Sequence, residues 1–185
     1  MKTILTFILT SFLFQTGDIE KLKEAFSNLE LESTKENQQL YFDQFPEDFN
    51  SFKSTFGYQN EEYAPLYNDS YDYINKFFSL DKIPIDEKLK KSIEIGIHGK
   101  WQADAVNIFQ HNLRPLLLSN VDLTYEILKK KENEEIGSLF YFFFQGVHPQ
   151  YVEIPKEFNQ IQNIDKSFYS LIIAGYEKAM NDSEH

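Results

Sequence analysis

Apolar residues recur at helical spacing along most of this chain. Phenylalanines at positions 45, 49, 52 and 56 are separated by steps of four, three and four residues, which place them on one face of an α-helix. Pro46 suits the first turn of that helix, and Gly57 suits its end. The same spacing predicts further helices near residues 18–31, 71–78, 87–97, 101–118, 123–131 and 164–180.

The stretch from Gly99 to Leu118 has the longest apolar helical face near the middle of the chain and contains the only tryptophan. At 100° per residue, one arc of this helix carries Trp101, Ala105, Val106, Ile108, Phe109 and Leu113. Asp104, Asn107 and His111 fall together on the adjoining edge. Pro115 predicts a bend or an end, because proline lacks an N–H and crowds the preceding turn.

Two short apolar runs fit a strand as well as a helix. Isoleucines alternate over residues 93–97, and residues 139–144 read LFYFFF. A strand is therefore an alternative in either place, although the helical context around both runs favours a helix. The predicted fold is an all-α, single-domain orthogonal bundle of six to eight short helices. A short stack of helical pairs is the alternative; the bundle is preferred because no repeat of fixed period is visible.

The first seventeen residues are typical of an export signal. Lys2 supplies a positive start, residues 4–14 are mostly apolar, and residues 15–17 end in small side chains. The apolar run is too short to span a bilayer, and its side chains lie all round a helix, unlike an amphipathic one. We therefore expect a signal peptide at 1–17, a helical domain at 18–185, and a periplasmic or extracellular bacterial location. The absence of cysteine excludes disulfides and suits that envelope compartment.

Charge narrows the classes of partner. The net charge is −11, and removal of Lys2 with the signal makes it −12. A protein this acidic is repelled by phosphate backbones and anionic lipid, which argues against nucleic acid and against stable membrane insertion of the mature chain. The acidic charge is then explained either by a basic protein partner or by simple solubility. It does not determine the oligomeric state.

Five of the eleven tyrosines lie in residues 58–73, mixed with acidic residues. Tyrosines on a loop form a recognition surface for a protein or a platform that stacks against sugars. Alternatively, Tyr71 belongs with Ile74 and Phe78 to the buried stripe of the next helix. The expected binding residues are Tyr58, Tyr63, Tyr67 and Trp101.

Motifs for catalysis or cofactors are absent from the sequence. It contains no G-x-S-x-G, no H-E-x-x-H, no phosphate-binding glycine loop and no dinucleotide fingerprint, so neither a cofactor nor a metal is expected. The remaining catalytic hypothesis makes His111 a general base or ligand, oriented by Asp104 beside Asn107, with Trp101 as a pocket wall. Additional histidines that would complete such a site are His98 and His148.

Together these features favour an exported, non-catalytic, acidic helical protein that holds a protein partner. An immunity protein against a toxin delivered to the envelope is one instance that fits the size, charge and export. The alternative function is a small hydrolase or metal-dependent enzyme built on Asp104, Asn107 and His111.

Overall fold

The computed structural model describes residues 18–59, 61–146 and 151–183. The predicted signal peptide, residues 1–17, and His148 lie outside these residues. The described residues are mostly helical, with ten helices, which confirms the all-α prediction and exceeds the expected number. They comprise the helical segment 18–31, α2 (Lys35–Gln44), α3 (Phe49–Phe56), α4 (Ser70–Ser79), α5 (Ile85–Gly96), α6 (Ala105–Leu118), α7 (Val121–Leu128), α8 (Asn133–Phe144), α9 (Asn159–Ile164) and α10 (Lys166–Ser183).

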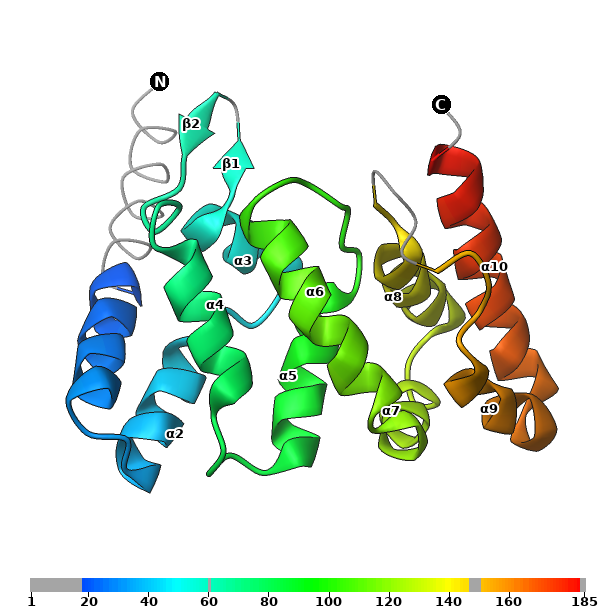
Figure 1. Cartoon of the computed structure of the whole chain (residues 1–185), viewed down its shortest axis with the longest axis horizontal. Helices are drawn as coiled ribbons and strands as arrows, with labels where there is room; N and C mark the ends of the chain where they lie inside the picture. Colours follow the sequence, from blue (N-terminus) through cyan, green and yellow to red (C-terminus); the bar gives the residue numbers. More distant parts are fainter. Residues whose placement is uncertain (1–17, 60, 147–150, 184–185) are drawn as a thin grey trace, which may run out of the picture.

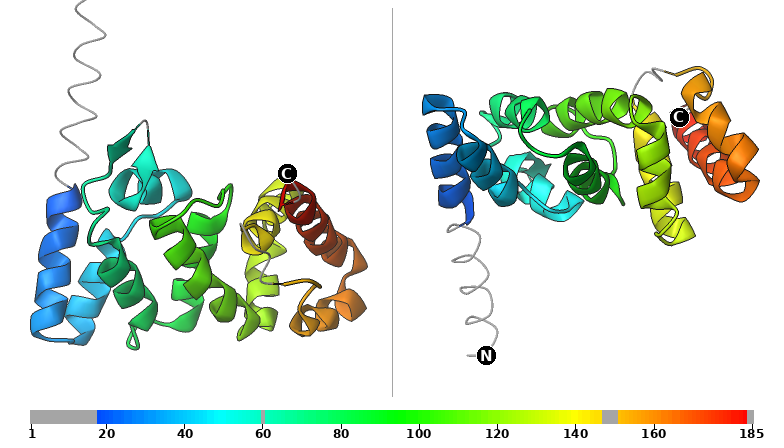
Figure 2. Two further views of the ribbon diagram at one scale, coloured as in Figure 1. Left: turned by 45° about the horizontal axis from the view of Figure 1, so that its top comes forward. Right: turned by 90° about the horizontal axis from the view of Figure 1, so that it is seen from below.

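The helices are spread along the longest axis of the molecule broadly in chain order, from the segment 18–31 at one end to α10 at the other, although α3 lies between α4 and α5 (Figure 1). Figure 2 shows α4 and α6 in one layer and α3 and α5 in a second layer against it. Contacts join α3 to α5, α4 to α6, α5 to α7, α6 to α8 and α8 to α10. The structure is consistent with the all-α bundle that the sequence predicts, in which each helix buries its apolar face against its neighbours.

One apolar cluster runs from Ile19 to Ala179, and aromatic rings form much of it. The predicted phenylalanine stripe is buried at all four positions. It is divided between two elements, however: Phe45 caps the end of α2, and α3 begins at Phe49. The division arises because Asp48 caps α3, where its carboxylate accepts a hydrogen bond from the Ser51 N–H at 2.8 Å. The stripe therefore predicts the core correctly and the helix boundary wrongly.

Both runs that left room for a strand are helical, so the strand alternative at 93–97 and 139–144 is wrong. The reason is burial on several sides: α5 contacts α3, α6, α7 and α8, and α8 lies between α6 and α10. A helix enclosed in this way carries apolar residues around most of its circumference, which hides the helical period. Among the described residues the strands are β1 (Tyr58–Gln59) and β2 (Glu62–Tyr63), which pair antiparallel.

Cationic side chains from neighbouring helices bind the C-terminal ends of several helices. The Arg114 side chain on α6 donates from Nε to the Phe143 carbonyl at 2.7 Å and from Nη2 to the Gln145 carbonyl at 2.9 Å, at the end of α8. Lys88 and Lys91 on α5 donate in the same way to the last carbonyls of α4 and α2. Terminal helix carbonyls lack intrahelical partners and carry negative partial charge, so these cations tie adjacent helices together.

A close approach of backbones joins α8 to α10. A Cβ atom added at Gly175 would lie 2.7 Å from both the Phe140 Cβ and the Tyr141 backbone nitrogen. Gly175 thus lets α10 rest directly on the backbone of α8, as its place in an apolar helical face predicts. None of the helices in the described part of the chain is long and apolar enough to cross a membrane.

Candidate functional site

Three tyrosines form a ladder on the surface of the short hairpin. Tyr58 and Tyr63 are opposite residues in the β1–β2 pair, and their ring centroids are 5.1 Å apart. The ring of Tyr67 continues the series, 4.5 Å from that of Tyr63. Tyr58 is 46% exposed and Tyr63 is 67% exposed. We call Tyr58, Tyr63 and Tyr67 the tyrosine ladder, and it is present where the sequence predicts a recognition surface.

Backbone hydrogen bonds fix this hairpin to the end of α3. The Ala64 N–H donates to the Gly57 carbonyl at 2.9 Å, and the Leu66 N–H donates to the Thr55 carbonyl at 3.0 Å. Gly57 is required at that end, because a Cβ there would lie 2.7 Å from the Lys53 carbonyl oxygen. The side chain of Leu66 is buried, so the segment after the hairpin is anchored in the core. The ladder therefore stands on a fixed backbone.

The ladder is joined to the loop before α6 by a hydrogen bond. The Tyr67 hydroxyl donates to the Asp104 Oδ2 atom, and this bond is the main reason that the pKa of Tyr67 is raised to about 12. The phenol accordingly keeps its proton over the physiological range. Asp104 has φ 62° and ψ −121°, in a region that favours glycine, and therefore holds an unusual backbone conformation at the ladder.

Trp101 lies on this loop, whereas the sequence predicts it within the helix. The first residue of α6 is Ala105, and Trp101 is half-buried. The Trp101 indole Nε1 donates to the Asn107 Oδ1 atom at 3.3 Å, and its backbone N–H donates to the Gln145 Oε1 atom at 2.6 Å. Trp101 is therefore held by side chains of α6 and of the α8 C-terminus.

A chain of side-chain hydrogen bonds extends from Trp101 to the last helix. Gln145 donates from Nε2 to the Tyr141 hydroxyl oxygen at 2.6 Å, and that hydroxyl donates to the Asp182 Oδ2 atom at 2.7 Å. Burial, followed by the bond to Asp182, raises the pKa of Tyr141 to about 12. Sequence reasoning missed Gln145, Tyr141 and Asp182, since residues so far apart in the chain give no local signal of a shared network.

The three side chains of the catalytic hypothesis have separate roles in the structure. Asp104 accepts from Tyr67, and Asn107 accepts from Trp101. His111 is exposed, and its side chain has no hydrogen bond or ion pair with any residue that the structure describes. The sequence predicts these three side chains on one edge of a helix that includes Asp104. The positive φ of Asp104 turns the chain at that residue, so Asp104 is not part of the helix.

The remaining histidines add no support for a metal centre. His98 is exposed at φ 58°, just after the end of α5, and its backbone N–H donates to the Ser138 Oγ atom at 3.0 Å. Across 18–59, 61–146 and 151–183 no group of three or more His, Asp or Glu residues is placed to hold a metal ion. His148 lies outside those ranges.

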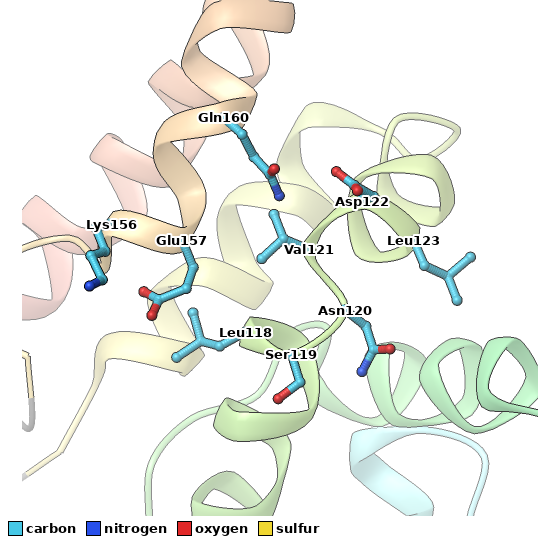
Figure 3. A pocket seen from close by; sticks show the side chains of 9 residues that line it. All are labelled: Leu118, Ser119, Asn120, Val121, Asp122, Leu123, Lys156, Glu157 and Gln160. Carbon is cyan, nitrogen blue, oxygen red and sulfur yellow. The ribbon is translucent and has the colours of Figure 1, made fainter.

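Three hollows formed by described residues lie away from the ladder. One, of about 650 Å³, separates the α6–α7 connection from α9 and the 3₁₀ turn η1 (Lys156–Phe158). Figure 3 shows Glu157 and Gln160 pointing toward Leu118 and Val121 across this hollow. Two others, of about 420 and 690 Å³, flank the acidic α2–α3 connection. Their linings contain neither the ladder nor Trp101.

The candidate site is thus the tyrosine ladder together with Asp104 and Trp101, which we call the tyrosine–aspartate surface. It presents aromatic faces, hydroxyl groups and a carboxylate on a fixed backbone, a combination suited to binding. Its hydrogen bonds join phenol to carboxylate and indole to amide. Comparison of the chain with protein-family models, curated proteins and solved structures gives no match.

Proposed function

We propose that this chain is an exported, non-catalytic binding protein that holds a protein partner at the tyrosine–aspartate surface. The observation that carries the proposal is the exposed ladder, in which Tyr63 is two-thirds exposed yet ordered by rings on both sides. Tyrosine is enriched at protein interfaces because one side chain offers a large apolar face and a polar tip.

The fixed geometry of the ladder supports a binding role. Tyr67 is tied to Asp104, and the hairpin is tied to α3, so the rings lose little conformational freedom when a partner covers them. Other large exposed apolar side chains stand on separate elements, such as Leu31 and Ile164. Single exposed residues of that kind are normal on protein surfaces, whereas three adjoining rings form a patch.

The enzyme alternative has less support from the same geometry. A base at His111 would need an orienting carboxylate, and the His111 side chain has no hydrogen bond or ion pair with any carboxylate among the described residues. Export, and the immunity-type role that export would permit, depend on residues 1–17, which lie outside the described residues. They remain predictions, as does the basic character of the partner.

A capture experiment with matched variants tests the proposal. The purified chain serves as bait for the envelope fraction of its source organism, beside the variants Tyr63→Ala and Tyr71→Ala. Tyr71 is a suitable control because it is 65% exposed, almost as much as Tyr63, but lies on α4 outside the ladder. A partner retained by the chain and by Tyr71→Ala but lost with Tyr63→Ala is the expected result. Equal retention by all three proteins would count against the surface.

A further inference from the structure

The tyrosine ladder lies in a long stretch of the helical domain that contains several acidic residues and no lysine or arginine. Between Lys53 and Lys76 the chain has no lysine or arginine. The same stretch holds the whole ladder and four carboxylates. These carboxylates belong to Glu61, Glu62, Asp69 and Asp72.

The carboxylates around the ladder lack cations of their own. Some acidic residues on other elements form ion pairs, for example Asp86 with Lys90 at 3.2 Å and Glu94 with Lys131 at 2.5 Å. Within the described ranges, neither Asp104 nor any of the four carboxylates between Lys53 and Lys76 forms one. The surface therefore attracts positive charge from outside the chain.

Asp104 is arranged to accept a further hydrogen bond. Its Oδ2 atom is held by the Tyr67 hydroxyl, and its Oδ1 atom has no hydrogen-bond partner among the described residues. The carboxylate is thus oriented before any partner arrives. The ring of Tyr67 stacks at an inclined angle on that of Tyr63, whose face is negative like that of any aromatic ring. A cation over these rings would meet both the ring face and the carboxylate.

From this arrangement we propose that the partner is anchored by an arginine side chain of a basic segment, stacked on the ladder at Tyr63 and bonded to Asp104. The inference rests on the proposed function and specifies its partner. Arginine fits better than lysine, because the planar guanidinium stacks on an aromatic face while its edge donates to a carboxylate.

A second copy of this chain does not supply that arginine. The sequence contains a single arginine, Arg114, which is 3% exposed and is bonded to the end of α8. A guanidinium at the ladder must therefore come from a different protein. The acidic surface also repels a second copy of this acidic chain, which favours a basic partner over self-association.

The test uses a defined probe: a blocked hexapeptide of alternating arginine and glycine, with lysine and citrulline versions for comparison. Citrulline keeps the shape of arginine and removes its charge. Binding to the purified chain is measured by calorimetry and by the fluorescence of Trp101, which lies on the loop that carries Asp104. We expect the arginine peptide to bind more tightly than the lysine peptide, and the citrulline peptide to bind weakest.

Matched variants assign the binding to the surface. Asp104→Asn keeps an acceptor for Tyr67 and removes the charge, and Tyr63→Leu removes the ring; each should weaken binding of the arginine peptide by about threefold to fivefold. The controls Asp122→Asn and Tyr71→Leu should change it by less than about twofold, because their side chains lie on α7 and α4, outside the ladder and its four carboxylates.

Several results would overturn the arginine anchor: no binding of the arginine peptide, equal binding of the citrulline peptide, or binding unaffected by Asp104→Asn and Tyr63→Leu. If partner capture still depended on Tyr63 in those cases, the proposed function would stand and only the arginine anchor would fall. Binding of a neutral oligosaccharide that depends on Tyr63 but not on Asp104 would also contradict the anchor, and would indicate a sugar platform.

Discussion

Two glycines inside the helices of the α8–α10 contact should respond to alanine in opposite directions. Both lie in helix interiors, Gly137 in α8 and Gly175 in α10. Alanine is favoured over glycine there by about 0.5–1 kcal/mol, because glycine loses more backbone entropy on folding. The surroundings differ: a Cβ at Gly137 would meet nothing within 4 Å, whereas one at Gly175 would lie 2.7 Å from the Tyr141 backbone nitrogen.

The magnitudes follow from these surroundings. Gly137→Ala should raise the free energy of unfolding by about 0.5–1 kcal/mol, since nothing opposes the gain in helix propensity. Gly175→Ala should force α10 away from α8, and overpacking of this kind costs about 1–3 kcal/mol. After the gain in propensity, a net loss of up to about 2.5 kcal/mol remains.

Urea denaturation followed by circular dichroism measures both changes, and the slope of the transition checks that two-state unfolding is preserved. The double variant should give the sum of the two effects only if Gly137 and Gly175 are independent. Stabilisation by Gly175→Ala, or a loss on Gly137→Ala equal to that of Gly175→Ala, would refute the packing of α10 on the α8 backbone.

Three further predictions concern the polar groups that join the helices. Arg114→Lys should destabilise the protein by about 1–3 kcal/mol in urea denaturation, because a lysine keeps a buried charge but does not span the two carbonyls at the end of α8; stability equal to that of the original chain would contradict the cap. Gln145→Leu should shift the emission of Trp101 toward that of a water-exposed indole while the helix content stays the same, and an unchanged spectrum would show that Gln145 does not position the loop. Tyr67→Phe should remove one tyrosine that titrates near pH 12 in the ultraviolet, given the raised pKa of Tyr67. The stability from that hydrogen bond is present below pH 10, the ordinary pKa, and is lost as the pH rises toward 12, so the two proteins should differ less in stability at pH 12 than at pH 8.

Sequence patterns predict the all-α core and the region of the ladder. Steps of three and four residues select Phe45, Phe49, Phe52 and Phe56, and all four are buried. Clustering of tyrosines selects Tyr58, Tyr63 and Tyr67, since an amphipathic side chain on a turn-rich segment has little core to enter. Tyr71 shows the limit of that reading: the buried residues of α4 include Tyr73, Ile74 and Phe77, and Tyr71 is exposed. Ile74 and Phe78 of the predicted stripe do pack in the core, so the prediction fails at Tyr71 alone.

The start and the continuity of α6 could not be read from the sequence. A left-handed residue at Asp104 delays the helix to Ala105, and such a conformation in a residue other than glycine has no reliable signal. Pro115 does not end the helix, because α6 continues to Leu118. Proline in a helix interior costs about 3 kcal/mol, which the burial of Leu117 in the following turn helps to offset.

The hydrogen bonds of the candidate site could not be predicted, because they join distant parts of the chain. The bond from Tyr67 to Asp104 spans 37 positions, and the bond from Trp101 to Gln145 spans 44. Polar side chains of these types occur on many exposed surfaces, so the sequence does not show which of them will bond to one another. The partners are set by how the helices pack. Only the fold brings them to one surface.

The central claim, that the ladder holds a protein partner, is tested most directly by the affinity of the captured partner for three proteins. Calorimetry compares the original chain with Tyr63→Ala and Tyr71→Ala, two substitutions at side chains of nearly equal exposure. Truncation of a central aromatic contact typically weakens binding by about tenfold or more, whereas a residue outside the interface changes it little. We predict a loss of that size for Tyr63→Ala and an unchanged affinity for Tyr71→Ala. Equal affinities for all three proteins would show that the partner binds elsewhere.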